Sequence, residues 1–242
     1  MRTAPRHLKA SSPLPATLPQ ATTRFLEAFA RSAGFCRLAG VDEAGRGPWA
    51  GPVVAAAVIL RTPLLPIRID DSKRLSAPAR ARAFDVIMDH AEVGFGMASA
   101  EEIDQANILQ ASLLAMSRAI LDLPSTPDLV LVDGSTAPML RIPCWPLVQG
   151  DRRSYLISCA SIMAKVLRDR LMEFYHGLYP RYAFHRHKGY GTLLHAARLR
   201  QFGPSVLHRH TFRPVRDDAA RRHVGTPPTP NCVREEREKN LV

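Results

Sequence analysis

Two apolar runs on either side of a short glycine- and proline-rich segment constrain the fold of this chain more than any other feature. Residues Phe35 to Val41 and Val53 to Leu60 are rich in the apolar residues of buried strands. The eleven residues between them contain three glycines and two prolines, which interrupt regular structure and favour a reversal of the chain. We therefore predict that the two runs pair as an antiparallel hairpin.

The rest of the chain alternates between helical and strand patterns. Ser76 and Pro78 indicate the start of a helix that ends near His90, and Ser99 with Glu102 forms a capping box. The other predicted elements are a helix capped by Asn107 over 108–121, helices at 155–175 and 193–202, and strands at 92–98, 129–132 and 145–148. They predict one α/β domain, a mixed β-sheet flanked by helices on both faces with a helical, basic C-terminal segment.

Both ends of the chain differ in composition from the middle. Residues 1–21 contain four prolines and no acidic residue, and we expect a disordered leader there. This leader lacks the apolar core of a secretory signal. Residues 217–242 are polar and poor in core residues, which predicts a flexible tail. The compact domain is therefore expected over 22–216.

Membrane-spanning and disulfide-rich classes are excluded. The longest unbroken apolar run, 53–60, is much shorter than the ~20 residues that cross a bilayer. The four cysteines lie far apart without a C-x-x-C pair, so neither a disulfide scaffold nor a cysteine zinc site is indicated. We expect a cytoplasmic protein.

The chain carries a formal net charge of +11, and residues 152–216 account for all of it. That segment has 13 basic residues against Asp169 and Glu173, whereas the residues before and after it are balanced. Because arginine and lysine bind phosphate groups and release counterions, a nucleic acid is the expected partner. The alternative is a solvated surface that binds nothing.

Carboxylates stand where the apolar runs stop. Asp42 and Glu43 follow the first strand, Asp133 follows the strand at 129–132, and Asp151 comes after the next strand. Neighbouring strands lie ~4.8 Å apart, so acids at their ends converge. A site made only of carboxylates suits Mg²⁺ or Mn²⁺ rather than zinc. The alternative is that each carboxylate caps a turn.

The segment between the first two strands contains Gly45, Arg46 and Gly47. It lacks the Gly-Lys-Ser/Thr ending of a P-loop, and no helix follows it as in a dinucleotide-binding loop, so a nucleotide cofactor is not expected. Glycines let backbone N–H groups approach a ligand closely. The alternative is an ordinary glycine turn.

Seven stretches carry the most distinctive patterns: AGVDEAGRGPWAGPVVAAAVIL (39–60), DSKRLS (71–76), EEIDQANILQAS with LLAMSRA (101–119), LVLVDG (129–134), GDRRSYLISCASIMAKVLRDR (150–170), YPRYAFHRHKGYGTLLH (179–195) and HRHTF (208–212). In this order they resemble the type 2 bacterial ribonuclease H family, ribonuclease HII. The resemblance covers the whole compact part of the chain.

The resemblance implies an RNase H-like fold and endonucleolytic hydrolysis of the RNA strand of RNA–DNA hybrids. It also implies a cut on the 5′ side of a single ribonucleotide embedded in duplex DNA, which leaves 3′-hydroxyl and 5′-phosphate ends. The expected partners are RNA–DNA hybrids and ribonucleotide-containing duplex DNA, with no membrane, and we expect a monomer. Two alternatives stay open: a non-catalytic nucleic-acid-binding protein, and an RNase H-like nuclease that cuts plain DNA.

By position in the family's motifs, four carboxylates are implied to be catalytic and to hold two Mn²⁺ or Mg²⁺ ions during two-metal-ion phosphodiester hydrolysis: Asp42, Glu43, Asp133 and Asp151. These are the same residues that the strand ends single out.

The resemblance also implies the residues that bind the substrate. The loop Gly45-Arg46-Gly47 contacts the ribonucleotide 2′-hydroxyl through its backbone, and Tyr190 packs against the sugar of the next deoxynucleotide. Ser72 and Lys73 lie by the phosphates, and Lys188 is a further substrate-binding residue.

Several conspicuous residues are given no part in the site. Asp169 lies between two arginines in a predicted helix, where an ion-pair or packing role is expected. The His-x-His pairs at 185–187 and 208–210 lack a nearby cysteine or acid to complete a zinc site. Gln149 and Trp49 stand where many family members have a lysine and a small aliphatic residue.

Overall fold

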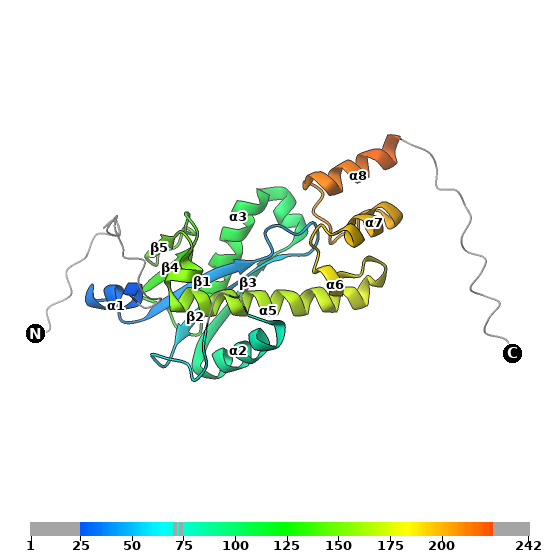
Figure 1. The fold of residues 1–242 in the computed structure, drawn as a ribbon. Helices are drawn as coiled ribbons and strands as arrows, with labels where there is room; N and C mark the ends of the chain where they lie inside the picture. Colours follow the sequence, from blue (N-terminus) through cyan, green and yellow to red (C-terminus); the bar gives the residue numbers. More distant parts are fainter. Residues whose placement is uncertain (1–24, 70–71, 73–74, 225–242) are drawn as a thin grey trace, which may run out of the picture.

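The computed structural model describes residues 25–69, 72 and 75–224 (Figure 1). Its centre is a five-stranded sheet in the order β3-β2-β1-β4-β5. The sheet is mixed, as predicted, because β1 pairs antiparallel with β2 and parallel with β4. The strands are β1 (Leu38–Ala44), β2 (Val53–Leu60), β3 (Ala91–Ala98), β4 (Leu129–Asp133) and β5 (Cys144–Leu147).

The hairpin of β1 and β2 is confirmed, and β2 has the predicted bounds. β1 begins at Leu38 rather than at Phe35. The backbone N–H groups of Cys36 and Arg37 donate instead to the carboxylate of Asp128, at 3.0 and 2.8 Å. At its other end β1 continues through the two acidic residues that we expected just after it, so their backbone is fixed by pairing with β2.

Helices cover both faces of the sheet, as predicted. α3 (Ala100–Leu121) packs on one face, whereas α2 (Ala77–His90) and α5 (Tyr155–Leu178) pack on the other (Figure 1). Glycines on both faces make this contact close. A Cβ at Gly94 or Gly96 would lie 2.2 Å from a carbonyl oxygen of α3, and a Cβ at Gly40 would lie 2.3 Å from the backbone of α5.

α3 contains the two helix starts that the sequence predicts. Ser99 accepts the N–H of Glu102, whose carboxylate accepts the N–H of Ser99 in return. Asn107 then breaks the helix with a φ of 69°, and its side chain accepts the N–H groups of Leu109 and Gln110. The helix therefore bends at an internal cap.

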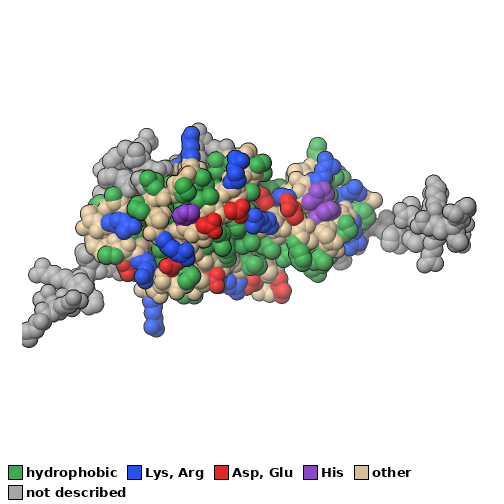
Figure 2. All heavy atoms as spheres, turned by 90° about the horizontal axis from the view of Figure 1, so that it is seen from below, with side chains coloured by type: hydrophobic (Ala, Val, Ile, Leu, Met, Phe, Trp, Pro, Cys, Tyr) green, Lys and Arg blue, Asp and Glu red, His purple; other side chains and the backbone are tan. Residues whose placement is uncertain are grey.

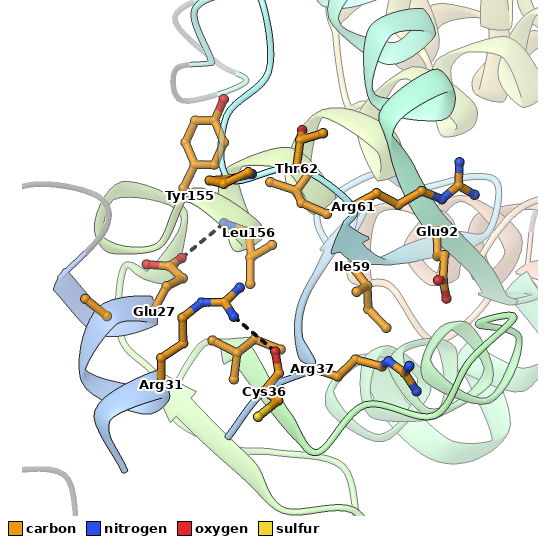
Figure 3. A pocket seen from close by; sticks show the side chains of 14 residues that line it. Glu27, Arg31, Cys36, Arg37, Ile59, Arg61, Thr62, Glu92, Tyr155 and Leu156 are labelled. Atoms are coloured by element: carbon orange, nitrogen blue, oxygen red, sulfur yellow. Dashed lines mark hydrogen bonds between the residues drawn. The ribbon is translucent and has the colours of Figure 1, made fainter. Parts of the chain in front are cut away.

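α1 (Phe25–Ser32) lies at the end of the sheet where β1 begins (Figure 1). A cavity of about 750 Å³ opens there, and Glu27, Arg31 and Arg37 are among the residues that line it (Figure 3). Leu38, the first residue of β1, also lines this cavity. The cavity therefore lies at the opposite end of β1 from the predicted carboxylates.

Beyond the other end of the sheet lie η1 (Pro180–Tyr182), α6 (Phe184–His187), α7 (Leu193–Phe202) and α8 (Arg213–Val224) (Figure 1). α7 has the predicted bounds. α8 is anchored by the fully buried Val215 and continues helically through residues 217–224, the start of the segment expected to be a tail. The rest of that segment and the expected leader lie outside the described residues. No helix in the described part of the chain is long and apolar enough to cross a membrane.

Candidate active site

The carboxylates predicted at strand ends come to one end of the sheet. β1 and β4 are parallel neighbours, and Val41 pairs with Val132. The next residues along the two strands are Asp42 and Asp133, which therefore lie side by side. Glu43 follows on β1. Strand register thus places Asp42 beside Asp133, and Glu43 is close enough for its charge to act on Asp42 and for the charge of Asp133 to act on it.

Asp42 is held in surroundings that disfavour its charge. Only 5% of its surface is exposed, and this burial raises the pKa of Asp42 well above its usual value. The negative charges of Glu43 and Asp133 raise the pKa further, whereas a hydrogen bond to the side chain of Ser161 lowers it. Oδ1 of Asp42 also accepts the backbone N–H of Glu43 at 2.7 Å. The carboxylate is oriented by these two hydrogen bonds, but in the described part of the chain no positively charged group offsets the effect of its burial.

Glu43 has one paired and one unpaired carboxylate oxygen. Oε1 lies 3.3 Å from Nη1 of Arg46, whereas Oε2 is buried and has no hydrogen-bond partner among the described residues. Burial raises the pKa of Glu43, Arg46 lowers it and Asp133 raises it. A buried carboxylate oxygen without a donor is rare in folded proteins, and it offers a free ligand position.

The fourth carboxylate, Asp151, lies on the short helix α4 (Gly150–Arg153). Gln149 begins this turn in a left-handed conformation, with a φ of 55°. The N–H of Gly150 then donates to Oδ1 of Asp133 at 2.7 Å, and the N–H of Asp151 lies 3.4 Å from the same oxygen. Asp151, which is 8% exposed, is thereby tied to the carboxylate at the end of β4.

The donor chemistry of these carboxylates fits a divalent metal. Within the described ranges, no three Asp, Glu, His or Cys side chains already stand in the arrangement of a metal site. Carboxylates that repel one another separate when no cation neutralises them. The unpaired Oε2 of Glu43 and the raised pKa of Asp42 are the two features that a bound cation would relieve. Oxygen donors of this kind suit Mg²⁺ and Mn²⁺.

Ser72 lies beside the carboxylates but inside the protein. It is 4% exposed, and its hydroxyl lies 3.0 Å from the hydroxyl of Ser161, which hydrogen-bonds to Asp42. Ser72 therefore reaches the candidate metal site through Ser161. Lys73, the other residue that we expected by the phosphates, lies outside the described residues.

The glycine loop turns next to the carboxylates. Gly45 is buried with a φ of +99°, whereas Arg46 and Gly47 are exposed. Two fully buried arginines, Arg168 and Arg209, hold the loop from inside. They donate hydrogen bonds to the carbonyl oxygens of Gly45, Arg46, Ala50, Gly51 and Pro52.

Sequence reasoning missed these two arginines, because it assigned the basic residues of 152–216 to the surface. A signal for Arg168 was present. Ala164 and Met172 lie four residues before and after it and are both buried, so helical periodicity places Arg168 on the buried face of α5. No comparable sequence signal marks Arg209.

Tyr190 lies beside the loop and is 42% exposed. Its ring centre is 5.8 Å from both Nζ of Lys165 and Cζ of Arg168. The carbonyl of Gly189 accepts the N–H of Trp49 at 2.8 Å, which ties the segment of Tyr190 to the glycine loop. The structure thus brings the two predicted sugar-contacting elements together.

Trp49 and Lys188 are held by neighbours in this region. The Trp49 indole packs on His195, at 5.4 Å between ring centres, and fills the space that a side chain at position 191 would need. The ammonium of Lys188 donates to Glu173 and to the carbonyl of His185, both at 2.7 Å.

Buried histidines fix the backbone of Tyr190. Nδ1 of His195 lies 3.0 Å from the carbonyl of Tyr190, so this nitrogen carries the proton. Its Nε2 must then accept from Nε2 of His208, 3.1 Å away. Nδ1 of His208 is free to accept the N–H of Ser205 at 3.0 Å. Burial lowers the pKa of His195 to about 4 and of His208 to about 3, so both rings are neutral.

The positive charge of residues 152–216 is distributed more widely than the sequence suggests. Two of its arginines are buried, and Asp169 forms an ion pair, one of the two roles expected for it, with Lys165 at 2.8 Å rather than with a neighbouring arginine. On the face shown in Figure 2, basic and acidic side chains lie together, and histidines gather at one end. This face is therefore not a uniformly positive surface.

Comparisons with known proteins agree with this geometry. The family model described as Ribonuclease HII matches residues 39–215. A ribonuclease HII of Chlamydia muridarum is 52% identical over 186 residues, which are 76% of this chain and 85% of that protein. A ribonuclease HII of Chloroflexus aggregans is 50% identical over 188 residues, 75% of this chain and 89% of that protein.

Solved structures show the same fold. The ribonuclease H2 of Pyrococcus horikoshii OT3 has a TM-score of 0.66 at 24% identity and covers 78% of this chain and 100% of its own. Bst-RNase HIII in complex with Mn²⁺ has a TM-score of 0.61 at 17% identity, covering 87% of this chain and 76% of its own. These similarities confirm the predicted α/β, RNase H-like fold class.

Proposed function

Because this chain belongs to the ribonuclease HII family, whose members are endoribonucleases that act on RNA–DNA hybrids, we propose that it also nicks duplex DNA on the 5′ side of a single embedded ribonucleotide. The reaction is hydrolysis of one phosphodiester. Water adds to phosphorus and the bond to the 3′-oxygen breaks, which leaves a 3′-hydroxyl and a 5′-phosphate. The cut would begin the removal of ribonucleotides from DNA during repair and replication.

The observation that carries this proposal is the cluster of Asp42, Glu43 and Asp133 beside an exposed Arg46-Gly47 step. Each of the first two carboxylates has its pKa raised by burial and by neighbouring negative charge. Such a cluster destabilises the fold unless it binds cations, which supports a catalytic rather than a turn-capping role.

We assign two divalent ions, Mg²⁺ or Mn²⁺, to this cluster. Asp42, Glu43, Asp133 and Asp151 would hold these ions, which would supply an activated water for attack on phosphorus. When bound, the ions lower the pKa of that water and neutralise the charge that develops on the leaving 3′-oxygen. The manganese complex solved for Bst-RNase HIII supports ions of this class.

The chain's own groups orient these ligands. The N–H of Gly150 holds one oxygen of Asp133, and the hydroxyl of Ser161 bonds to Asp42. Arg46 engages Oε1 of Glu43, and the buried Oε2 has no hydrogen-bond donor among the described residues. Ligands fixed in this way lose little freedom when the ions bind.

The choice of sugar rests on the glycine loop and Tyr190. The 2′-hydroxyl is the only chemical difference between a ribonucleotide and a deoxyribonucleotide at one sugar. We propose that backbone groups of the Gly45-Arg46-Gly47 loop contact this hydroxyl and that Tyr190 packs on the next deoxyribose. Its exposed ring, next to the loop, supports this role.

Three further residues, Ser72, Lys73 and Lys188, complete the proposed substrate contacts. Ser72 and Lys73 would lie near the phosphates, with Ser72 acting through its bond to Ser161. Lys188 would contribute positive charge, although its ammonium is paired with Glu173. We further propose that the protein works as a monomer. The free thiols of the described cysteines fit a reducing compartment, which supports the proposal that it works in the cytoplasm.

Three duplexes test the proposal: a uniform RNA–DNA hybrid, DNA with one ribonucleotide, and all-deoxy DNA. We expect cleavage of the first two with Mg²⁺ or Mn²⁺, none of the third, and loss of all cleavage with a chelator. Binding without cleavage under every divalent ion would identify a non-catalytic nucleic-acid-binding protein. Cleavage of the all-deoxy duplex would identify a DNA nuclease.

A further inference from the structure

Arg168 and Arg209 are the largest fully buried side chains described in the structure, and neither is an assigned site residue. Among the described residues, every hydrogen bond of their guanidinium groups goes to a backbone carbonyl oxygen. Burying a cation without a carboxylate partner is costly, and an apolar side chain of similar size would fill the space at lower cost. Their position therefore requires a reason other than core packing.

Arg209 fixes the orientation of two peptide groups in the glycine loop. Its Nη2 donates to the carbonyl of Gly45 at 2.6 Å and its Nη1 to the carbonyl of Arg46 at 2.8 Å. In a trans peptide the N–H points opposite to the C=O. The N–H groups of Arg46 and Gly47 are thus turned away from Arg209, toward the exposed side of the loop.

Arg168 joins the loop to the segment of Tyr190. Its Nε and Nη2 donate to the carbonyls of Pro52 and Ala50, while Nη1 donates to the carbonyl of Lys188 at 2.9 Å. The same guanidinium lies 5.8 Å from the ring centre of Tyr190. One side chain from α5 therefore spans both sugar-contacting elements.

The glycines of the loop are shaped around α5. A Cβ at Gly45 would lie 2.0 Å from Nε of Arg168, and a Cβ at Gly51 would lie 2.4 Å from Sδ of Met172. Both glycines also have positive φ, +99° and +86°. Because glycine has no Cβ, the loop backbone can approach α5 closely at these two positions.

We propose that Arg168 and Arg209 are positioning residues for sugar recognition. Arg209 would point the N–H groups of Arg46 and Gly47 toward the 2′-hydroxyl, and Arg168 would set the distance between the loop and Tyr190. The inference rests on the proposed function and deepens it, because it explains how a backbone without side-chain donors is held rigid enough to select a sugar.

The test compares Arg168→Lys, Arg209→Lys and the corresponding Met variants with Arg170→Lys. Arg170 is a matched control, because it lies on the same helix but its guanidinium is exposed and stacks on Phe84. For each protein we would measure kcat and KM on the single-ribonucleotide duplex and on the uniform hybrid, affinity for the duplex in chelator, and the melting temperature. All rates would be measured at a temperature well below the melting temperature of every variant.

We expect each Lys variant to lose about tenfold or more in kcat on the single-ribonucleotide duplex while duplex affinity stays within about twofold, because lysine cannot form the planar fork of hydrogen bonds. Arg168→Lys should lose more on the single ribonucleotide than on the hybrid. The Met variants should lose more than the Lys variants, and Arg170→Lys nothing.

A folded Lys variant with wild-type kcat would overturn the inference. So would a loss of kcat matched by an equal loss of duplex affinity, since that pattern is a general structural effect. If the Met variants fail to fold, the Lys variants decide alone. If the wild-type protein itself leaves the single ribonucleotide uncut, the proposed function fails and not merely this extension of it.

Discussion

Oδ1 of Asp133 accepts a 2.7 Å hydrogen bond from the backbone N–H of Gly150. This bond joins the end of β4 to the turn that carries Asp151, although the two partners are 17 positions apart in the sequence. Gln149, which begins this turn, is exposed and makes no side-chain cap, while the hydroxyl of Ser158 donates to the carbonyl of Asp151 at 2.6 Å. The carboxylate of Asp133 is therefore one of the groups that fix the turn of Asp151.

Gly150→Ala should disturb both carboxylates. A Cβ at this position would lie 3.1 Å from Oδ1 of Asp133 and 2.6 Å from Cδ1 of Ile157. We expect a loss of ~1–3 kcal/mol in unfolding free energy from overpacking, and a clear loss of kcat. Gly177→Ala is the control, because nothing lies within 4 Å of its Cβ and alanine favours the helix. Wild-type kcat in Gly150→Ala would show that this bond does not matter for catalysis.

Asp42→Asn should abolish cleavage and stabilise the metal-free protein. The variant removes a buried charge whose pKa is raised by burial and by two neighbouring carboxylates. We expect kcat to fall by at least ~100-fold, since a ligand to charge-stabilising ions is lost. The melting temperature in chelator should rise, by roughly 2–4 °C for each kcal/mol of repulsion relieved.

The control for this variant is Asp85→Asn, because the side chain of Asp85 is 70% exposed. It should leave both activity and melting temperature unchanged. Hybrid binding by Asp42→Asn should stay near wild type. A lower melting temperature in chelator for Asp42→Asn would contradict the view that this carboxylate is strained without cations.

Divalent ions should stabilise the wild-type protein. Relief of repulsion among Asp42, Glu43 and Asp133 predicts a melting temperature that rises with Mn²⁺ or Mg²⁺ concentration. The rise should disappear in Asp133→Asn, which loses a ligand. Calorimetry in chelator and in Mn²⁺ would measure it, and an equal rise in both proteins would place the ions elsewhere.

Tyr190→Ala should affect one substrate more than the other. The ring is exposed and lies beside the glycine loop, so its loss should reduce kcat/KM on a single embedded ribonucleotide more than on a uniform hybrid. Tyr190→Phe keeps the ring and should retain activity. Equal losses on both duplexes in Tyr190→Ala would count against a role in recognising the junction.

Acidification should destabilise the fold through His195 and His208. Their pKa values in the folded protein, about 4 and about 3, lie below the value of 6.5 expected in the unfolded chain. The unfolded state therefore binds more protons as the pH falls below 6.5. Stability is lost down to about pH 4 through His195 and down to about pH 3 through His208, by at most ~1.4 kcal/mol per pH unit for each histidine.

Urea unfolding across this range would measure the effect. His208→Gln should show a shallower dependence on pH, by up to one proton, than the wild-type protein. An unchanged slope would mean that His208 is already protonated in the fold.

Local signals account for what could be predicted from the sequence. The caps at Ser76, Ser99 and Asn107 depend on residues within three positions, and all three form as predicted. The proximity of Asp42 and Asp133 was also predictable, because the ends of parallel strands meet at one edge of a sheet. The register of β1 and β4 then places these two residues side by side.

Contacts between distant segments could not be predicted in the same way. β1 starts late because Asp128, far along the chain, takes the N–H groups of Cys36 and Arg37. Arg209 is buried among carbonyl groups that accept its hydrogen bonds, and these partners lie more than 150 positions away in the sequence. A count of charges assigns such a residue to the surface, since only the folded chain shows which backbone groups surround it.

Cleavage of a duplex with one ribonucleotide tests the central claim most directly. The duplex would be incubated with the wild-type protein and Mn²⁺ or Mg²⁺, and its ends mapped. The proposed site predicts a single nick on the 5′ side of the ribonucleotide, with 3′-hydroxyl and 5′-phosphate ends, that chelator or Asp42→Asn abolishes. A nick that persists in chelator or in Asp42→Asn, or no nick under any divalent ion, would contradict it.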